Sequence, residues 1–160
     1  MLSNRVVFDL LASTHPGDLF IVRNVGNLIP PATAEGSSTG DLSEASAIES
    51  AVLLLKVANI VVCRRSECGA AKAVYARNPK THTPNLHKWL YYANNAAFRL
   101  EYEGPLDDSL KPHDQLSQIN VLTQLEHLMT YPVVRQQVTA GALVLSGWWF
   151  DIAAGSNVRV

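Results

Sequence analysis

The side chains most capable of chemistry lie together in the middle of the chain. Cys63 and Cys68 flank Arg64 and Arg65. A cysteine thiolate can bind a metal ion, whereas a guanidinium has no lone pair to donate and pairs with anions instead. One cysteine with no histidine nearby cannot complete a tetrahedral zinc site. Taken alone, these residues therefore indicate a buried or half-buried thiol at Cys68, and a small buried side chain at Cys63.

The sequence around these residues predicts a junction between a strand and a helix. Residues 60–63 are apolar and mostly β-branched, as in a buried strand, and a helix is expected to begin near Gly69. Open α/β folds keep their sites at the carboxyl ends of such strands. We therefore expect the cysteines and arginines to lie at one edge of a sheet.

Periodic patterns predict an α/β fold in a single domain over residues 1–160. Strands are expected over 19–24, 58–63 and 143–152, and helices over 44–56, 86–102 and 116–129, with a short helical turn over 8–13. Four histidines fall in predicted loops or on helices remote from the strand ends, namely His82, His87, His113 and His127. We do not expect any of them to complete a metal site.

The composition excludes several classes of protein. The 160 residues are 48% hydrophobic and 17% charged, with a net charge of −1, so bulk electrostatics favour neither nucleic acid nor an acidic membrane as a partner. There is no apolar run of about 18 residues, and the N-terminus lacks the basic-then-apolar layout of a signal peptide. We expect a cytoplasmic protein whose two cysteines form no structural disulfide.

Four motifs, in order along the chain, resemble those of the β-class carbonic anhydrases. Residues 61–70 are similar to the family's zinc signature, V-V-C-G-H-S-x-C-G-A. The other three matches are residues 22–30 to V-R-N-A-G-N-x-I-P, residues 120–134 to N-V-x-x-Q-L-x-x-L-x-T-Y-P-x-V, and residues 143–152 to L-x-G-W-x-Y-D-I. The resemblance implies a mostly parallel β-sheet flanked by helices, and a dimer or an oligomer built from dimers.

At the family's zinc site the resemblance implies that most ligands are replaced. Cys68 matches a ligand cysteine, but Arg65 stands at the ligand histidine and Arg64 at a glycine. Arg65 cannot bind a metal and would repel Zn²⁺, so we expect it to pair with the Cys68 thiolate, with Glu67 or with an anion such as bicarbonate. Ser50 replaces an aromatic residue that, in the family, helps to wall the active-site cleft.

The first residues of the chain resemble the family's other zinc-site motif, C-x-D-S-R-V. Alignment on Arg5 places Met1 at the first ligand cysteine and Ser3 at the catalytic aspartate. In the family this aspartate and the retained arginine orient or gate the zinc-bound water, so Arg5 is also a candidate anion-binding residue beside Arg65.

The sequence lacks the family's N-terminal helices and its first strand, which lies inside the sheet. If the chain is complete, we expect another segment or another chain to fill the gap, because unpaired strand edges would otherwise remain. The alternative is a sequence that is truncated relative to the native product.

These departures favour a carbonic anhydrase homologue with a degenerate, metal-free zinc site that is catalytically inactive. It would act in assembly or regulation, as a homodimer or as a hetero-oligomer with an intact paralogue. One alternative is an active zinc enzyme that converts CO₂ and water to bicarbonate and a proton, with its site completed by a partner or by the missing N-terminus. Another is a module that binds bicarbonate through Arg5 and Arg65 without turnover. A carboxysome location follows only by analogy with the family.

Overall fold

The computed structural model describes residue 15, residues 17–77 and residues 83–160. The helical turn predicted over 8–13 and the predictions for Met1, Ser3, Arg5 and His82 lie outside these residues. The described helices are α2 (Leu42–Glu49), a π-helical turn (Ser50–Leu54), α3 (Gly69–Tyr75), α4 (Pro84–Leu90), a 3₁₀ turn (Tyr91–Ala93), α5 (Asn94–Tyr102), α6 (Pro112–Thr130) and α7 (Pro132–Thr139). The described strands are β1 (Asn59–Arg65), β2 (Val144–Asp151) and β3 (Ser156–Arg159).

The three strands form one sheet in the order β1-β2-β3. β1 and β2 run parallel, with Asn59 beside Val144 and Arg65 beside Phe150. β3 returns antiparallel to β2, so the described sheet contains one parallel and one antiparallel pair. The strands predicted over 58–63 and 143–152 are confirmed as β1 and β2, and the α/β fold is confirmed with them.

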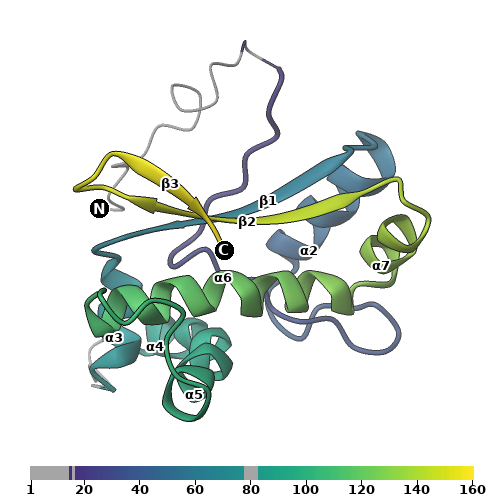
Figure 1. Cartoon of the computed structure of the whole chain (residues 1–160). Helices are drawn as coiled ribbons and strands as arrows, with labels where there is room; N and C mark the ends of the chain where they lie inside the picture. Colours follow the sequence, from purple (N-terminus) through teal and green to yellow (C-terminus); the bar gives the residue numbers. More distant parts are fainter. Residues whose placement is uncertain (1–14, 16, 78–82) are drawn as a thin grey trace.

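Helix α6 lies along one face of the sheet and packs against both β1 and β2 (Figure 1). Val121 and Leu128 of α6 are buried with Val62 of β1 in the main core cluster. Gly147 of β2 lies so close to α6 that a Cβ atom there would be 2.7 Å from Cγ1 of Val121. α6 therefore holds the two parallel strands in place, and the cysteines and arginines lie at the carboxyl end of the first of them.

The strand predicted over residues 19–24 is wrong. These residues form no strand among the described part of the chain, and the side chains of Leu19, Phe20, Ile21 and Val22 are 39–51% exposed. The run has the branched and aromatic residues of a strand, but β-propensity reflects packing on a pleated surface, and no strand among the described residues pairs with this run.

The predicted helices exist with different boundaries. The helix expected over 44–56 is α2 followed by the π-helical turn, and the one expected over 86–102 is divided into α4, a 3₁₀ turn and α5. The third extends beyond its predicted 116–129 to become α6, which has Pro112 in its first turn. α7 and β3 were not predicted.

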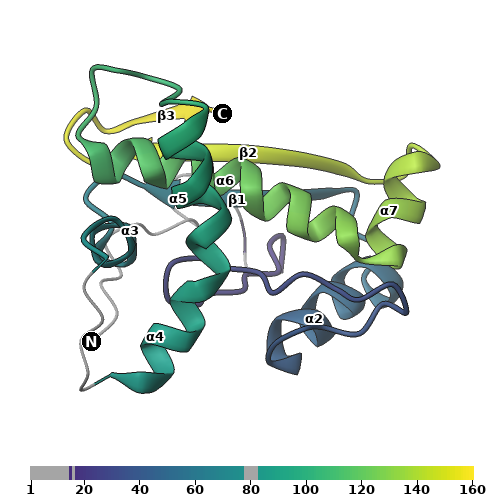
Figure 2. The same cartoon turned by 90° about the horizontal axis from the view of Figure 1, so that it is seen from below.

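Figure 2 shows α3, α4 and α5 at one end of α6, and α2 and α7 at its other end. In the first group, α3 and α5 pack directly against α6. In the second group, α7 packs directly against α6. In the part of the chain that the structure describes, no helix has the length and apolar character needed to cross a membrane.

Candidate functional site

The candidate site lies where β1 ends and α3 begins. β1 ends at Arg65, and Cys68 is the N-cap residue of α3. The intervening turn is held from β2, because the Ser66 N–H donates to the carbonyl of Phe150 at 2.9 Å and the Ile152 N–H donates to Ser66 Oγ at 2.9 Å. The turn that carries the cysteine is therefore fixed by hydrogen bonds to the neighbouring strand.

Arg64 is the arginine in contact with Cys68. Its Nη2 atom lies 3.6 Å from the Cys68 sulfur, and the residue is only 6% exposed. Gly26 faces the pair with φ +77°, and a Cβ atom there would lie 3.0 Å from Cβ of Ala70 and 3.6 Å from Nη2 of Arg64. The glycine leaves room for a buried guanidinium against a sulfur atom.

The surroundings of Cys68 favour its thiolate form. Burial acts to raise the pKa of the Cys68 thiol. The positive charge of Arg64 and hydrogen bonds from the backbone N–H groups of Ala70 and Ala71 act to lower it, and together they outweigh burial, so the pKa is lowered overall. Cys63 differs, because burial alone raises its pKa to about 11. Both cysteines are free and half-buried, so Cys63 is less buried than expected.

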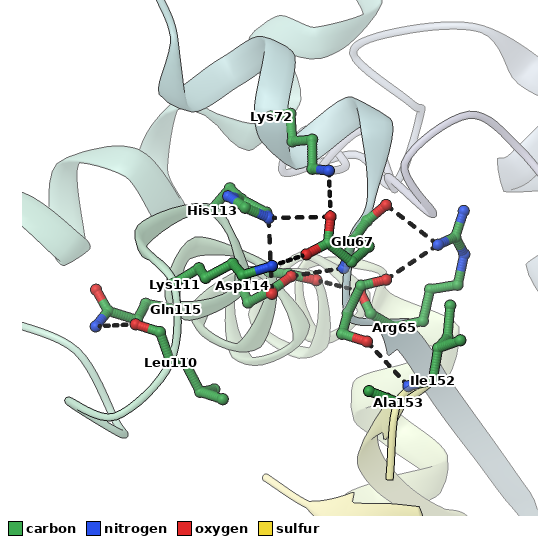
Figure 3. Close-up of polar contacts among 12 residues, drawn as sticks. Arg65, Glu67, Lys72, Leu110, Lys111, His113, Asp114, Gln115, Ile152 and Ala153 are labelled. Carbon is green, nitrogen blue, oxygen red and sulfur yellow. Dashed lines mark hydrogen bonds and ion pairs between the residues drawn. The ribbon is translucent and has the colours of Figure 1, made fainter. Parts of the chain in front are cut away.

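Arg65 points to the backbone of its own turn. Its Nη1 atom donates to the carbonyl oxygen of Ser66 at 3.0 Å and to that of Glu67 at 3.2 Å. In Figure 3 its guanidinium lies on the opposite side of the turn from Lys72. Arg65 thus donates to backbone carbonyl oxygens. The prediction of the Cys68 thiolate as a partner of Arg65 is wrong, because Arg64 makes that contact.

Strand alternation explains why Arg64 is buried and Arg65 is not. Side chains alternate between the two faces of a strand. Val62, Arg64 and Ser66 are all buried, at 3%, 6% and 5% exposed, whereas Arg65 is intermediate. Because Cys63 was expected to be buried, the same two-residue period predicts from the sequence that Arg65 points inward, whereas the structure buries Val62 and Arg64.

A second polar group adjoins the thiol site through Glu67 (Figure 3). The Glu67 carboxylate pairs with the ammonium groups of Lys72 and Lys111, and the Glu67 N–H donates to Asp114 Oδ1 at 2.7 Å. Hydrogen bonds from Lys111 and then Lys72 lower the pKa of Glu67 to about 2. His113 Nε2 lies 3.7 Å from Glu67 Oε2 and 3.6 Å from Asp114 Oδ2.

The expectation that the histidines lie remote from the strand ends is wrong for His113. It lies in the first turn of α6, 3.7 Å from the carboxylate of Glu67, which directly precedes Cys68. His127 is buried elsewhere on α6, with Nδ1 2.7 Å from the carbonyl oxygen of Ile29, and His87 lies exposed on α4. The packing of α6 brings His113 next to the turn between β1 and α3, and no periodic pattern in the sequence predicts that contact.

The described residues around Cys68 do not fit a zinc ion. Among them, the group of His, Cys, Asp and Glu side chains close enough to share a metal ion is Glu67, His113 and Asp114, which excludes Cys68. The Cys68 sulfur instead faces a guanidinium that has no lone pair to donate. No step through a zinc ion at Cys68 can be derived from these residues.

Comparison with known proteins identifies related sequences and structures. The sequence family described as "Carbonic anhydrase" matches residues 3–157. A carbonic anhydrase of Synechococcus elongatus is 36% identical, over 98% of this chain and 56% of that protein. One of Pseudomonas aeruginosa is 36% identical, over 95% of this chain and 66% of that protein. The chain thus spans a little over half to two thirds of the length of these relatives.

The solved structures agree. The β-carbonic anhydrase CcaA superimposes with a TM-score of 0.87 and 31% identity, over 99% of this chain and 75% of that one. A tetrameric β-carbonic anhydrase of Sordaria macrospora superimposes with a TM-score of 0.78 and 27% identity, over 95% of this chain and 73% of that one.

Proposed function

Because this chain belongs to the β-class carbonic anhydrase family, we propose that it is a single-domain member with a degenerate zinc site, which acts in assembly or regulation and does not hydrate CO₂. One observation carries the proposal. The Cys68 sulfur, the ligand atom retained from the family's motif, lies 3.6 Å from the buried guanidinium of Arg64. A fixed cation of the protein thus supplies the positive charge that a metal ion would bring to the thiolate.

Electrostatics explain why this arrangement opposes zinc. A catalytic zinc needs about three protein ligands and an exchangeable water whose pKa falls to about 7. A dication about 4 Å from a guanidinium is repelled by roughly 8 kcal/mol at an effective dielectric constant of about 20. Arg64 is buried and cannot withdraw into solvent as a surface lysine does. Metal binding at Cys68 would therefore require the arginine to leave the core.

In this proposal the other family positions are also altered. Arg65 occupies the place of the ligand histidine, Met1 that of the first cysteine and Ser3 that of the aspartate, while Arg5 is the retained arginine of the catalytic pair. The three N-terminal positions lie outside the described residues, so the proposal for them rests on the motif alone.

Exposed apolar surface supports a role in assembly. β1 forms one edge of the described sheet, and Val61 on it is 41% exposed. The run from Leu19 to Val22 exposes four large apolar side chains, and contiguous exposed apolar surface marks sites of association. We propose a homodimer or a hetero-oligomer with an intact paralogue as the working form.

Zinc content and CO₂ hydration, measured together on the purified full chain, test the inactive site. After incubation with ZnSO₄ and desalting, Cys68→Ser should retain as much zinc as the wild type, because Cys68 itself holds none, and stopped-flow hydration by the wild type should equal the buffer rate. A catalytically active family member treated in the same way serves as the positive control. Stoichiometric zinc together with rapid hydration would establish the active-enzyme alternative and overturn the proposal.

Co-expression tests the proposed partnership. Native mass spectrometry of this chain with an intact paralogue from the same genome should show mixed oligomers, and the mixed species should differ from the paralogue alone in hydration rate per zinc. If the two chains assemble only with themselves, the hetero-oligomer is ruled out.

Bicarbonate binding through Arg65 is tested by calorimetric titration. If Arg65 binds the anion, bicarbonate should release heat with the wild type and not with Arg65→Ala. Identical heats in the wild type and Arg65→Ala would remove the anion-binding alternative. We expect this result, because Arg65 already donates to the carbonyl oxygens of Ser66 and Glu67.

A further inference from the structure

Glu67, His113 and Asp114 bring three potential ligand atoms together within 4.8 Å of one another. The atoms are a carboxylate oxygen from the turn after β1, and an imidazole nitrogen and a second carboxylate oxygen from the first turn of α6 (Figure 3). This three-residue cluster is separate from the Cys68 position, and nothing in the proposed function depends on it.

The distances suit a metal ion. His113 Nε2 lies 3.7 Å from Glu67 Oε2 and 3.6 Å from Asp114 Oδ2. Two ligands about 2.1 Å from a tetrahedral ion lie about 3.4 Å apart, so movements of a few tenths of an ångström would complete the geometry. These separations are too long for hydrogen bonds, which end near 3.2 Å.

His113 provides the observation that points to a ligand. Its Nε2 atom is buried and has no hydrogen-bond partner, and the side chain as a whole is 17% exposed. Buried polar atoms almost always have a partner, and an imidazole nitrogen that faces two carboxylates without a hydrogen bond is placed where a cation could be shared among all three groups.

The cluster is held on rigid elements. The Asp114 side chain is 7% exposed, and its Oδ1 atom accepts the Glu67 N–H at 2.7 Å, which leaves Oδ2 on the side of His113. Glu67 adopts φ +55°, a left-handed conformation that is uncommon for a residue with a side chain. Local strain of this kind needs support from its surroundings, which the bond to Asp114 supplies.

Two lysines compete for the Glu67 carboxylate. Lys72 pairs with Oε2, the oxygen nearest His113, and Lys111 pairs with Oε1. Their side chains are 46% and 68% exposed, so either can return to water at the low cost of breaking a surface ion pair. Their charges weaken cation binding without blocking it.

We propose that Glu67, His113 and Asp114 bind a divalent transition-metal ion, with Lys72 leaving Glu67 Oε2 as the ion enters. One imidazole and two carboxylates suit Mn²⁺ or Zn²⁺. The ion would join the turn after β1 to the first turn of α6, and so would stabilise the segment that ends in Cys68.

Titration of the full chain with Mn²⁺, followed by electron paramagnetic resonance, tests this site. Mn²⁺ is the probe because it prefers carboxylate and imidazole ligands, so the Cys68 thiol does not compete. The wild type should bind one ion saturably. His113→Ala should weaken the affinity by about tenfold or more, as loss of a metal-site partner does. His87→Ala, on the exposed face of α4, should leave the affinity unchanged.

The lysine gives an independent arm that does not disturb the core. Lys72→Gln should tighten Mn²⁺ binding by about two- to fivefold, the ratio that corresponds to one surface ion pair. Lys88→Gln, an exposed lysine on α4, is its matched control and should have no effect. Absence of saturable binding in both the wild type and Lys72→Gln, or equal affinity in the wild type and His113→Ala, would overturn the proposal.

Discussion

Replacing Arg64 by methionine should raise the pKa of Cys68. Methionine keeps much of the volume of the buried side chain and removes its charge. The guanidinium is 3.6 Å from the sulfur, and its charge and hydrogen bond are what lower the pKa of Cys68 together with the N–H groups at the start of α3. With the charge removed, burial should dominate and favour the neutral thiol.

The contact distance sets the size of the effect. Two unit charges 3.6 Å apart interact by about 1 kcal/mol in water and about 5 kcal/mol at an effective dielectric constant of 20. An opposite charge at such a distance typically changes a pKa by about 1 to 3. Loss of an interaction of this size in Arg64→Met should therefore raise the pKa of Cys68 and move its alkylation midpoint to higher pH.

The assay is the pH dependence of iodoacetamide alkylation, with Cys68 identified by mass spectrometry of its peptide. Cys63 is distinguished in the same experiment, because its pKa of about 11 keeps it protonated at neutral pH. Arg65→Met is the matched control, since Arg65 donates to backbone carbonyl oxygens and should leave the alkylation midpoint unchanged. Equal midpoints in the wild type and Arg64→Met would refute the electrostatic pairing of Arg64 with Cys68.

Three further predictions concern the fold that holds the site. Burial lowers the pKa of His127 in the folded chain. As the pH falls below about 6.5, this histidine therefore takes up a proton in the unfolded chain before it does so in the folded chain. The stability that neutral His127 contributes is present above that pH and is lost below it. Urea unfolding should therefore lose less stability between pH 7 and 5 in His127→Asn than in the wild type, and parallel losses would contradict this. Gly147→Ala should lower the free energy of unfolding by about 1–3 kcal/mol, because the added Cβ would meet Val121 at 2.7 Å; an unchanged urea midpoint would show that α6 can move away. Tyr131→Phe removes the buried hydroxyl that donates to the Pro30 carbonyl at 2.7 Å and should cost about 1–3 kcal/mol in the same assay, where a neutral result would mean that water replaces the hydroxyl.

The sequence by itself determined the family, the α/β class and the two strands that precede and follow α6 along the chain. β1 and β2 are short apolar runs bounded by turn residues, and α6 carries a long helical repeat. These are local properties, because the period of the hydrophobic residues and the residues that end each element are written in consecutive positions. The same local information placed Cys68 directly after β1, at the start of a helix.

Tertiary structure decided which side chains meet at that position. Alternation along β1 turns Arg64 inward, but only the packing of α3 and the loop at Gly26 puts the Cys68 sulfur opposite its guanidinium. His113 reaches Glu67 because α6 crosses the sheet with its first turn beside the end of β1. The run over 19–24 has the composition of a strand and is not one, since a strand also needs a neighbouring edge. Contacts between distant segments depend on how helices and strands pack in three dimensions, which the period of any single segment does not specify.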